Sequence, residues 1–127
     1  MTTIVGTGLA DLLTGNGSGN TILGLAGDDT LRGLAGHDIL RGDAGNDTLD
    51  GGAGNDRVFA DEGNDRISGG SGDDFLVGGR GDDRAFGSDG VDQFIWNPGD
   101  GDDTFDGGAG DDQQQLHRNG RNREIPL

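Results

Sequence analysis

A period of nine residues runs through most of the chain and limits what it can fold into. In eight consecutive units, glycine stands fourth and aspartate stands sixth. The glycines are Gly27, Gly36, Gly45, Gly54, Gly63, Gly72, Gly81 and Gly90, and the aspartates are Asp29, Asp38, Asp47, Asp56, Asp65, Asp74, Asp83 and Asp92. Strict repetition of this length is typical of solenoids, in which each repeat packs only on its neighbours.

Each unit divides into a turn and a short strand. The first six residues are rich in Gly, Asn and Asp, which favour tight turns and left-handed backbone positions. The last three place an apolar residue at their centre, and alternation along a strand would point that residue inward. These central residues are Leu31, Leu40, Leu49, Val58, Ile67, Leu76, Ala85 and Phe94. One inward residue per strand predicts a narrow core.

The composition excludes most other classes of function. The chain has 127 residues, of which 24 are acidic and 9 basic, and its net charge is -15. Such a surface repels nucleic acids and anionic membranes. With 29% hydrophobic residues and 29 glycines, apolar burial alone is too small to order the chain. Cysteine is absent, which excludes disulfides and thiolate zinc sites. Divalent cations with oxygen ligands remain as natural partners.

The unit resembles GGxGxDxUx, the nonapeptide of the repeats-in-toxin (RTX) family, also called hemolysin-type calcium-binding repeats. The resemblance extends over about residues 6–112. It implies an all-β fold, a right-handed parallel β-roll that is a calcium-stacked β-solenoid with about 18 residues per coil. In that family, each calcium ion is held by two stacked aspartates and by backbone carbonyls. The carbonyls come from the second and fourth positions of one turn and from the first and third positions of the next.

Carried over to this chain, the resemblance implies about six to eight calcium ions as cofactor. The regular aspartate pairs are Asp29/Asp47, Asp38/Asp56, Asp47/Asp65, Asp56/Asp74, Asp65/Asp83 and Asp74/Asp92, with the carbonyls of the turns that contain the eight glycines. Two further pairs, Asp83/Asp103 and Asp92/Asp112, span an insertion of Trp96 and Asn97. Asp11/Asp29 and Asn20/Asp38 depart from the pattern, because their first turns lack the fourth-position glycine.

The regularity of the repeat divides the chain into four parts. We expect degenerate repeats or a cap over 1–23, a regular β-roll over 24–95, repeats after the two-residue insertion over 96–112, and an irregular tail, truncated or diverged, over 113–127. Residues 1–112 carry a formal charge of -17, which eight calcium ions would nearly neutralise. The sequence therefore predicts folding that depends on calcium.

One face of the predicted roll is apolar on its outer side. Alternate strands would display an apolar stripe there, made of Leu23, Ile39, Phe59, Phe75, Val77 and Ile95. A stripe of this kind is typical of self-association or of protein docking. The alternative is that these residues were selected only because they favour strands.

The function predicted from these features is calcium binding by a secreted, non-catalytic module. The chain has no GxSxG motif and no lysine for a phosphate loop, and an aspartate pair that shares calcium is a poor general acid. The alternatives are an accessory module of a secreted protease, lipase or alginate epimerase, or an extracellular adhesion element. His37 is interpreted as a solvent-facing turn residue without a role. We expect an extracellular location without an N-terminal signal peptide, and no membrane span.

Overall fold

The computed structural model describes residues 2–96, 102–106, 113–116 and 121–124, and the side chains of residues 3–95, 104 and 105. The described residues form strands and turns. The strands are β1 (Thr2–Val5), β2 (Leu12–Thr14), β3 (Asn20–Leu23), β4 (Thr30–Arg32), β5 (Ile39–Arg41), β6 (Thr48–Asp50), β7 (Arg57–Phe59), β8 (Arg66–Ser68), β9 (Phe75–Val77), β10 (Arg84–Phe86), β11 (Gln93–Trp96), β12 (Asp102–Asp106), β13 (Gln113–Leu116) and β14 (Arg121–Glu124). This part of the chain contains no helix of the length and hydropathy that a membrane crossing requires.

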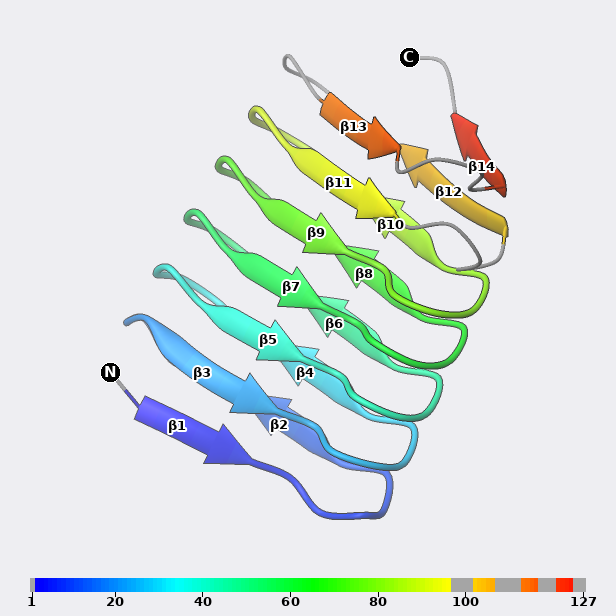
Figure 1. The fold of residues 1–127 in the computed structure, drawn as a ribbon. Coiled ribbons are helices and arrows are strands. Elements are labelled where there is room, and N and C mark those ends of the chain that lie inside the picture. The colour runs from blue at the N-terminus through cyan, green and yellow to red at the C-terminus, as the bar shows by residue number, and fades with distance from the viewer. Residues whose placement is uncertain (1, 97–101, 107–112, 117–120, 125–127) are drawn as a thin grey trace.

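Successive strands alternate between two parallel sheets. One sheet has the order β1-β3-β5-β7-β9-β11-β13 and the other has the order β14-β12-β10-β8-β6-β4-β2. Figure 1 shows the two sheets facing each other, with turns along both sides and one coil stacked on the next. Leu40 pairs with Ile22 in the coil before it and with Val58 in the coil after it. Hydrogen bonds between turns of neighbouring coils join positions separated by the same step of 18 residues, which confirms the predicted all-β parallel solenoid and its coil length.

The step between coils lengthens after β11. Arg84 pairs with Arg66 in the preceding coil but with Thr104 in the following one, and Gln93 pairs with Phe75 and with Gln113. In both sheets, paired residues of neighbouring coils are therefore two residues further apart in the sequence here than in the earlier coils. The insertion lengthens the chain between neighbouring coils, and the strands on both sides of it remain paired in parallel.

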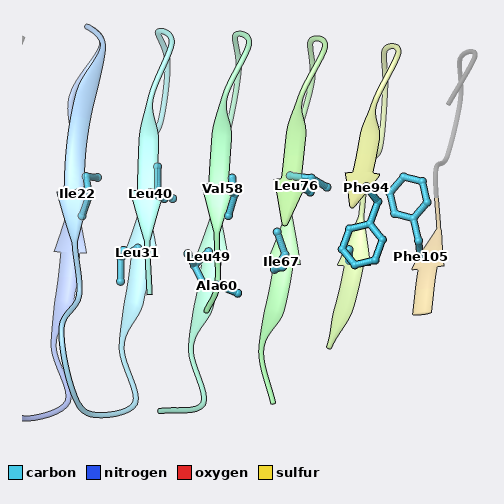
Figure 2. Close-up of a cluster of buried hydrophobic side chains, with 11 residues drawn as sticks. Ile22, Leu31, Leu40, Leu49, Val58, Ala60, Ile67, Leu76, Phe94 and Phe105 are labelled. Carbon is cyan, nitrogen blue, oxygen red and sulfur yellow. The ribbon is translucent and has the colours of Figure 1, made fainter. Parts of the chain in front are cut away.

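The core is a single column of side chains between the sheets. The central residues of the eight predicted strands are all buried, as the sequence predicts, and Ile22, Ala60 and Phe105 join them. Figure 2 shows these side chains along the axis of the stack. The Phe94 and Phe105 rings are stacked, with centroids 5.2 Å apart and planes 9° apart. Because each strand contributes only one side chain to the core, the turns must supply much of the remaining stability.

The fourth-position glycines allow the turns to stack closely. Gly54 has a φ of +105°, and a Cβ on it would overlap the carbonyl oxygen of Gly36 in the preceding coil. The first coil carries Leu9 and Ser18 in the equivalent positions. No turn of the described chain precedes theirs, so their side chains meet no such carbonyl.

This contact predicts a large difference between two Gly→Ala substitutions. Gly54→Ala should lower the free energy of unfolding by about 2 to 5 kcal/mol, because the methyl group adds left-handed backbone strain to steric overlap. Gly17→Ala is the matched control, since a Cβ there has no atom within 4 Å, and it should change stability by less than about 0.5 kcal/mol. Urea unfolding followed by circular dichroism in calcium buffer measures both. Equal losses would show that coil stacking does not require the glycine.

Candidate metal centre

The sixth-position aspartates form two buried columns, one along each side of the roll. All eight are 0 to 3% exposed. Within a column, the backbone N–H of each aspartate from Asp29 to Asp74 donates to Oδ1 of the aspartate one coil further on. Asp29 donates to Asp47 at 2.8 Å, and Asp56 donates to Asp74 at 2.9 Å. The structure thus places together all six regular pairs that the sequence predicts.

The second carboxylate oxygen is left without a partner in most of these residues. The Oδ2 atoms of six aspartates are buried and accept no hydrogen bond within the described part of the chain; they belong to Asp29, Asp38, Asp47, Asp56, Asp65 and Asp74. A buried carboxylate oxygen without a donor destabilises the fold, because its hydrogen bonds to water are lost and no donor of the protein replaces them. Six such atoms at equivalent positions indicate a shared ligand-binding geometry.

In four turns, those of Asp29, Asp38, Asp47 and Asp56, this oxygen and a carbonyl of the following turn lie beside the same Cβ position. The position that a Cβ of Gly33 would occupy lies 2.5 Å from Asp38 Oδ2 and 2.7 Å from the carbonyl oxygen of Gly51. At Gly51 itself, the corresponding distances to Asp56 Oδ2 and the carbonyl oxygen of Gly69 are 2.6 and 2.8 Å. First-position glycines therefore border a small space in which a carboxylate oxygen and a carbonyl oxygen converge.

Comparison with known families identifies these turns. A family model described as the RTX calcium-binding nonapeptide repeat matches the chain in four copies, at residues 5–40, 32–67, 68–95 and 99–113. The chain belongs to this family. A comparison with curated proteins gave no match. The matched segments contain every turn of the two aspartate columns, so the family's calcium-binding character applies to the geometry described above.

The donor set of the RTX turns fits calcium. Calcium accepts six to eight hard oxygen ligands, which include carboxylates and backbone carbonyls, in tolerant geometry. No three His, Cys, Asp or Glu side chains gather as a metal cluster within the described residues. A site here must therefore combine two carboxylates with main-chain carbonyls, as the RTX pattern implies. When bound, calcium would supply the positive charge that the buried carboxylates lack.

Burial shifts the titration of the RTX aspartates strongly. Loss of solvent raises the pKa of Asp47 to about 7, the pKa values of Asp56 and Asp65 to about 8, and the pKa of Asp74 to about 9. The charge of a neighbouring aspartate in the same column raises each of these pKa values further, and the backbone N–H donor lowers it in part. The polypeptide alone therefore favours neutral carboxyls at these positions.

In the first coil, hydrogen-bond donors of the chain occupy the places where regular turns leave Oδ2 unpaired, although Asn20 Oδ1 remains buried without a partner. The backbone N–H of Thr7 donates to Asp11 Oδ2 at 2.6 Å, and the Thr7 hydroxyl lies 3.0 Å from the same oxygen. In the other column, the amide Nδ2 of Asn20 donates to the Ser18 carbonyl at 2.7 Å. This nitrogen stands 2.8 Å from the Cβ position of Gly15, where regular turns place the carboxylate Oδ2. These two turns therefore differ chemically from the regular RTX turns.

The structure also contains a hydrogen-bond ladder that the sequence analysis missed. Fifth-position side chains accept the backbone N–H of the fifth residue one coil further on. Asn46 Oδ1 accepts from Asn64 at 2.9 Å, and His37 Nδ1 accepts from Asn55 at 2.9 Å. His37 is exposed, as expected, but it has a structural role as an acceptor. The recurrence of Asn and Asp at the fifth position of the units is the signal that could have revealed the ladder.

Two predicted metal residues lie beyond what the structure shows of side chains. Asp112 is outside the described residues, and Asp103 is described only as part of β12. The backbone N–H of Thr104 donates to the carbonyl of Asp83 at 2.9 Å, so β12 continues the stack of this column.

The raised pKa values predict that acid and calcium stabilise the RTX roll in different pH ranges. A carboxyl whose pKa is raised on folding favours the folded state when it is protonated. The metal-free roll should therefore be most stable below about pH 4, and should lose that stability as pH rises through the folded pKa values of about 7 to 9. In calcium, the β-structure should persist at pH 9. Circular dichroism across this pH range, with and without chelator, tests the prediction, and metal-free protein that is more ordered at pH 9 than at pH 5 would contradict it.

Proposed function

We propose that this chain is a non-catalytic module that folds when calcium binds between successive turns. The observation that carries the proposal is the set of six buried Oδ2 atoms without hydrogen-bond partners. Each lies in a column in which one coil follows the next, so a cation between coils would be shared by two turns. Calcium would thereby convert electrostatic repulsion between coils into attraction.

The proposed ligands are the six regular aspartate pairs together with carbonyls from both turns of each pair. The carbonyls of Gly42, Gly51, Ala60 and Gly69 lie beside the same Cβ positions as an aspartate Oδ2 of the preceding turn. The pairs Asp83/Asp103 and Asp92/Asp112 would raise the total from about six ions to about eight. Magnesium is a poor substitute, because it requires a tight octahedron and gives up its water reluctantly.

The large negative charge of the chain supports dependence on calcium. Burying carboxylates without a counter-charge is expensive, and this chain carries a net charge of -15. At ten times its dissociation constant, each bound ion adds about 1.4 kcal/mol to stability, and well below that constant it adds almost nothing. RTX repeat proteins are generally secreted, and we propose an extracellular location for this one, where calcium is plentiful enough to fill such sites.

We also propose the division of the chain that its repeats indicate. Residues 1–23 would form degenerate repeats or a cap, 24–95 the regular calcium-binding roll, 96–112 the continuation after the insertion, and 113–127 a tail of irregular sequence whose strands β13 and β14 extend the two sheets. The cap is supported by the hydrogen bonds of Asp11 and Asn20, which fill the place of a cation in the first coil.

A calcium titration tests the proposed function. Chelated protein should lack β-structure at neutral pH and gain it cooperatively with calcium, but weakly or not at all with magnesium. Asp56→Ala should raise the calcium midpoint more than Asp11→Ala, because Asp56 pairs with both Asp38 and Asp74 whereas Thr7 already holds Asp11. Circular dichroism gives the midpoints and calorimetry gives the number of ions. Full folding in chelator, or equal midpoints for both variants, would contradict the proposal.

The outer face of the first sheet is proposed as a contact surface for a second copy of the chain. The six residues of the apolar stripe are all half-buried. Phe59 and Phe75 meet edge to face with centroids 6.2 Å apart, and the Arg41 guanidinium lies 5.6 Å from the Phe59 centroid. Arg41 is also 4.0 Å from Asp61, so the apolar centre is bordered by charges of both signs. A second copy of the same face would offer complementary charges around an apolar centre.

Sedimentation should detect this contact. With calcium present, the wild-type chain should self-associate, and the double variant Phe59→Thr/Phe75→Thr should remain monomeric with nearly unchanged calcium affinity, since threonine keeps the strand preference. A wild-type chain that stays monomeric at high concentration would rule out the contact and would leave strand preference as the reason for the stripe.

A further inference from the structure

Ala60 breaks the rule that each regular turn begins with glycine. Of the eight regular units that start between residues 24 and 87, seven begin with glycine and one begins with Ala60. Ala60 is fully buried and belongs to the core cluster, as Figure 2 shows. Its methyl group therefore occupies a space that the other turns leave to different atoms.

The neighbouring turns show what that space contains. A Cβ built on Gly51 would lie 2.6 Å from Asp56 Oδ2 and 2.8 Å from the carbonyl oxygen of Gly69. A Cβ on Gly69 would lie 2.6 Å from Asp74 Oδ2, and one on Gly78 would lie 2.7 Å from Asp83 Oδ2. Real Cβ atoms essentially never approach heavy atoms closer than 3.0 Å. A methyl group at the first position therefore competes for room with the carboxylate of its own turn.

In the turn that begins at Ala60, the carboxylate concerned is that of Asp65, and the following turn begins at Gly78. We propose that the Ala60 methyl group makes Asp65/Asp83 the weakest of the six regular calcium sites. This inference rests on the proposed function, and it identifies which site of the roll departs from the others. Crowding in a well-packed interior weakens an interaction by an amount equivalent to about tenfold or more in affinity.

The effect is confined to one of the two pairs that contain Asp65. The position of a Cβ on Gly42 lies 2.9 Å from the carbonyl oxygen of Ala60, so this carbonyl faces the preceding pair, Asp47/Asp65. Replacing glycine by alanine leaves a carbonyl in place and adds only the methyl group. The preceding site therefore keeps its full donor set, and the weakness falls on the site between the turns 60–65 and 78–83.

The weak site is the last of the regular sites in its column. Three consecutive pairs span this column in the regular roll: Asp29/Asp47, Asp47/Asp65 and Asp65/Asp83. Because each coil is held only by its neighbours, the contact across this site would be the last in the column to tighten as calcium rises. The opposite column spans the same two coils through Asp56/Asp74 and is unaffected.

The test compares three variants of the full chain by calcium calorimetry and circular dichroism. Ala60→Gly should tighten the weakest binding step by about tenfold or more. Gly51→Ala should do the reverse, since it places the same methyl group beside Asp56 and its backbone does not have a positive φ. Ala10→Gly is the matched control, because Ala10 is exposed and stands in the fifth position, which supplies no carbonyl ligand in the RTX pattern.

The outcomes separate this inference from the proposed function. A selective gain in Ala60→Gly, with Ala10→Gly unchanged, supports a crowded site at Asp65/Asp83. Calcium-binding steps that are identical in Ala60→Gly, Ala10→Gly and wild type would overturn the inference and leave calcium-dependent folding intact. A wild-type chain that binds no calcium would overturn the proposed function itself. If Gly51→Ala does not fold, the comparison of Ala60→Gly with Ala10→Gly still decides the matter.

Discussion

The stacking of one buried carboxylate directly upon another is the interaction on which the roll depends. Each sixth-position aspartate receives a backbone N–H from the preceding coil through one oxygen, and in six of them the other oxygen has no donor. The hydrogen bond aligns the coils, and the remaining charge opposes their approach. Alignment and repulsion arise from the same side chain, so a cation that removes the repulsion also fixes the register. Under the proposed function, folding and ion binding would then be one process.

The fold was largely predictable because the period is strict. The nine-residue spacing gives the two sheets, the coil of two repeat units and the burial of central residues such as Leu49 and Leu76. It also places the aspartates in columns, which follows once the coil length is known. Regular spacing determines these features because every unit meets the same neighbours.

Other features were not predictable, because they depend on contacts between particular atoms. The role of His37 requires knowing that its Nδ1 faces the backbone N–H of Asn55, which spacing alone does not show. The internal hydrogen bonds of Asn20 similarly depend on the direction of an amide group. The most exposed large apolar side chains, Val5, Leu9 and Leu12, lie in the first coil and not in the apolar stripe, which is half-buried. The exposure of side chains in the first coil depends on contacts that the repeat pattern does not specify.

The uneven size of the core side chains gives the roll a defined alignment. Units that are nearly identical could pair one coil out of place with little change in their turns, and such degeneracy slows folding and promotes misassembly in repetitive chains. The core breaks this degeneracy near β10, where small Ala85 lies in the same core as the stacked rings of Phe94 and Phe105. A slipped pairing would separate these rings or crowd them against other strands. The aromatic pair therefore fixes which coil pairs with which, although the turns of the coils are nearly interchangeable.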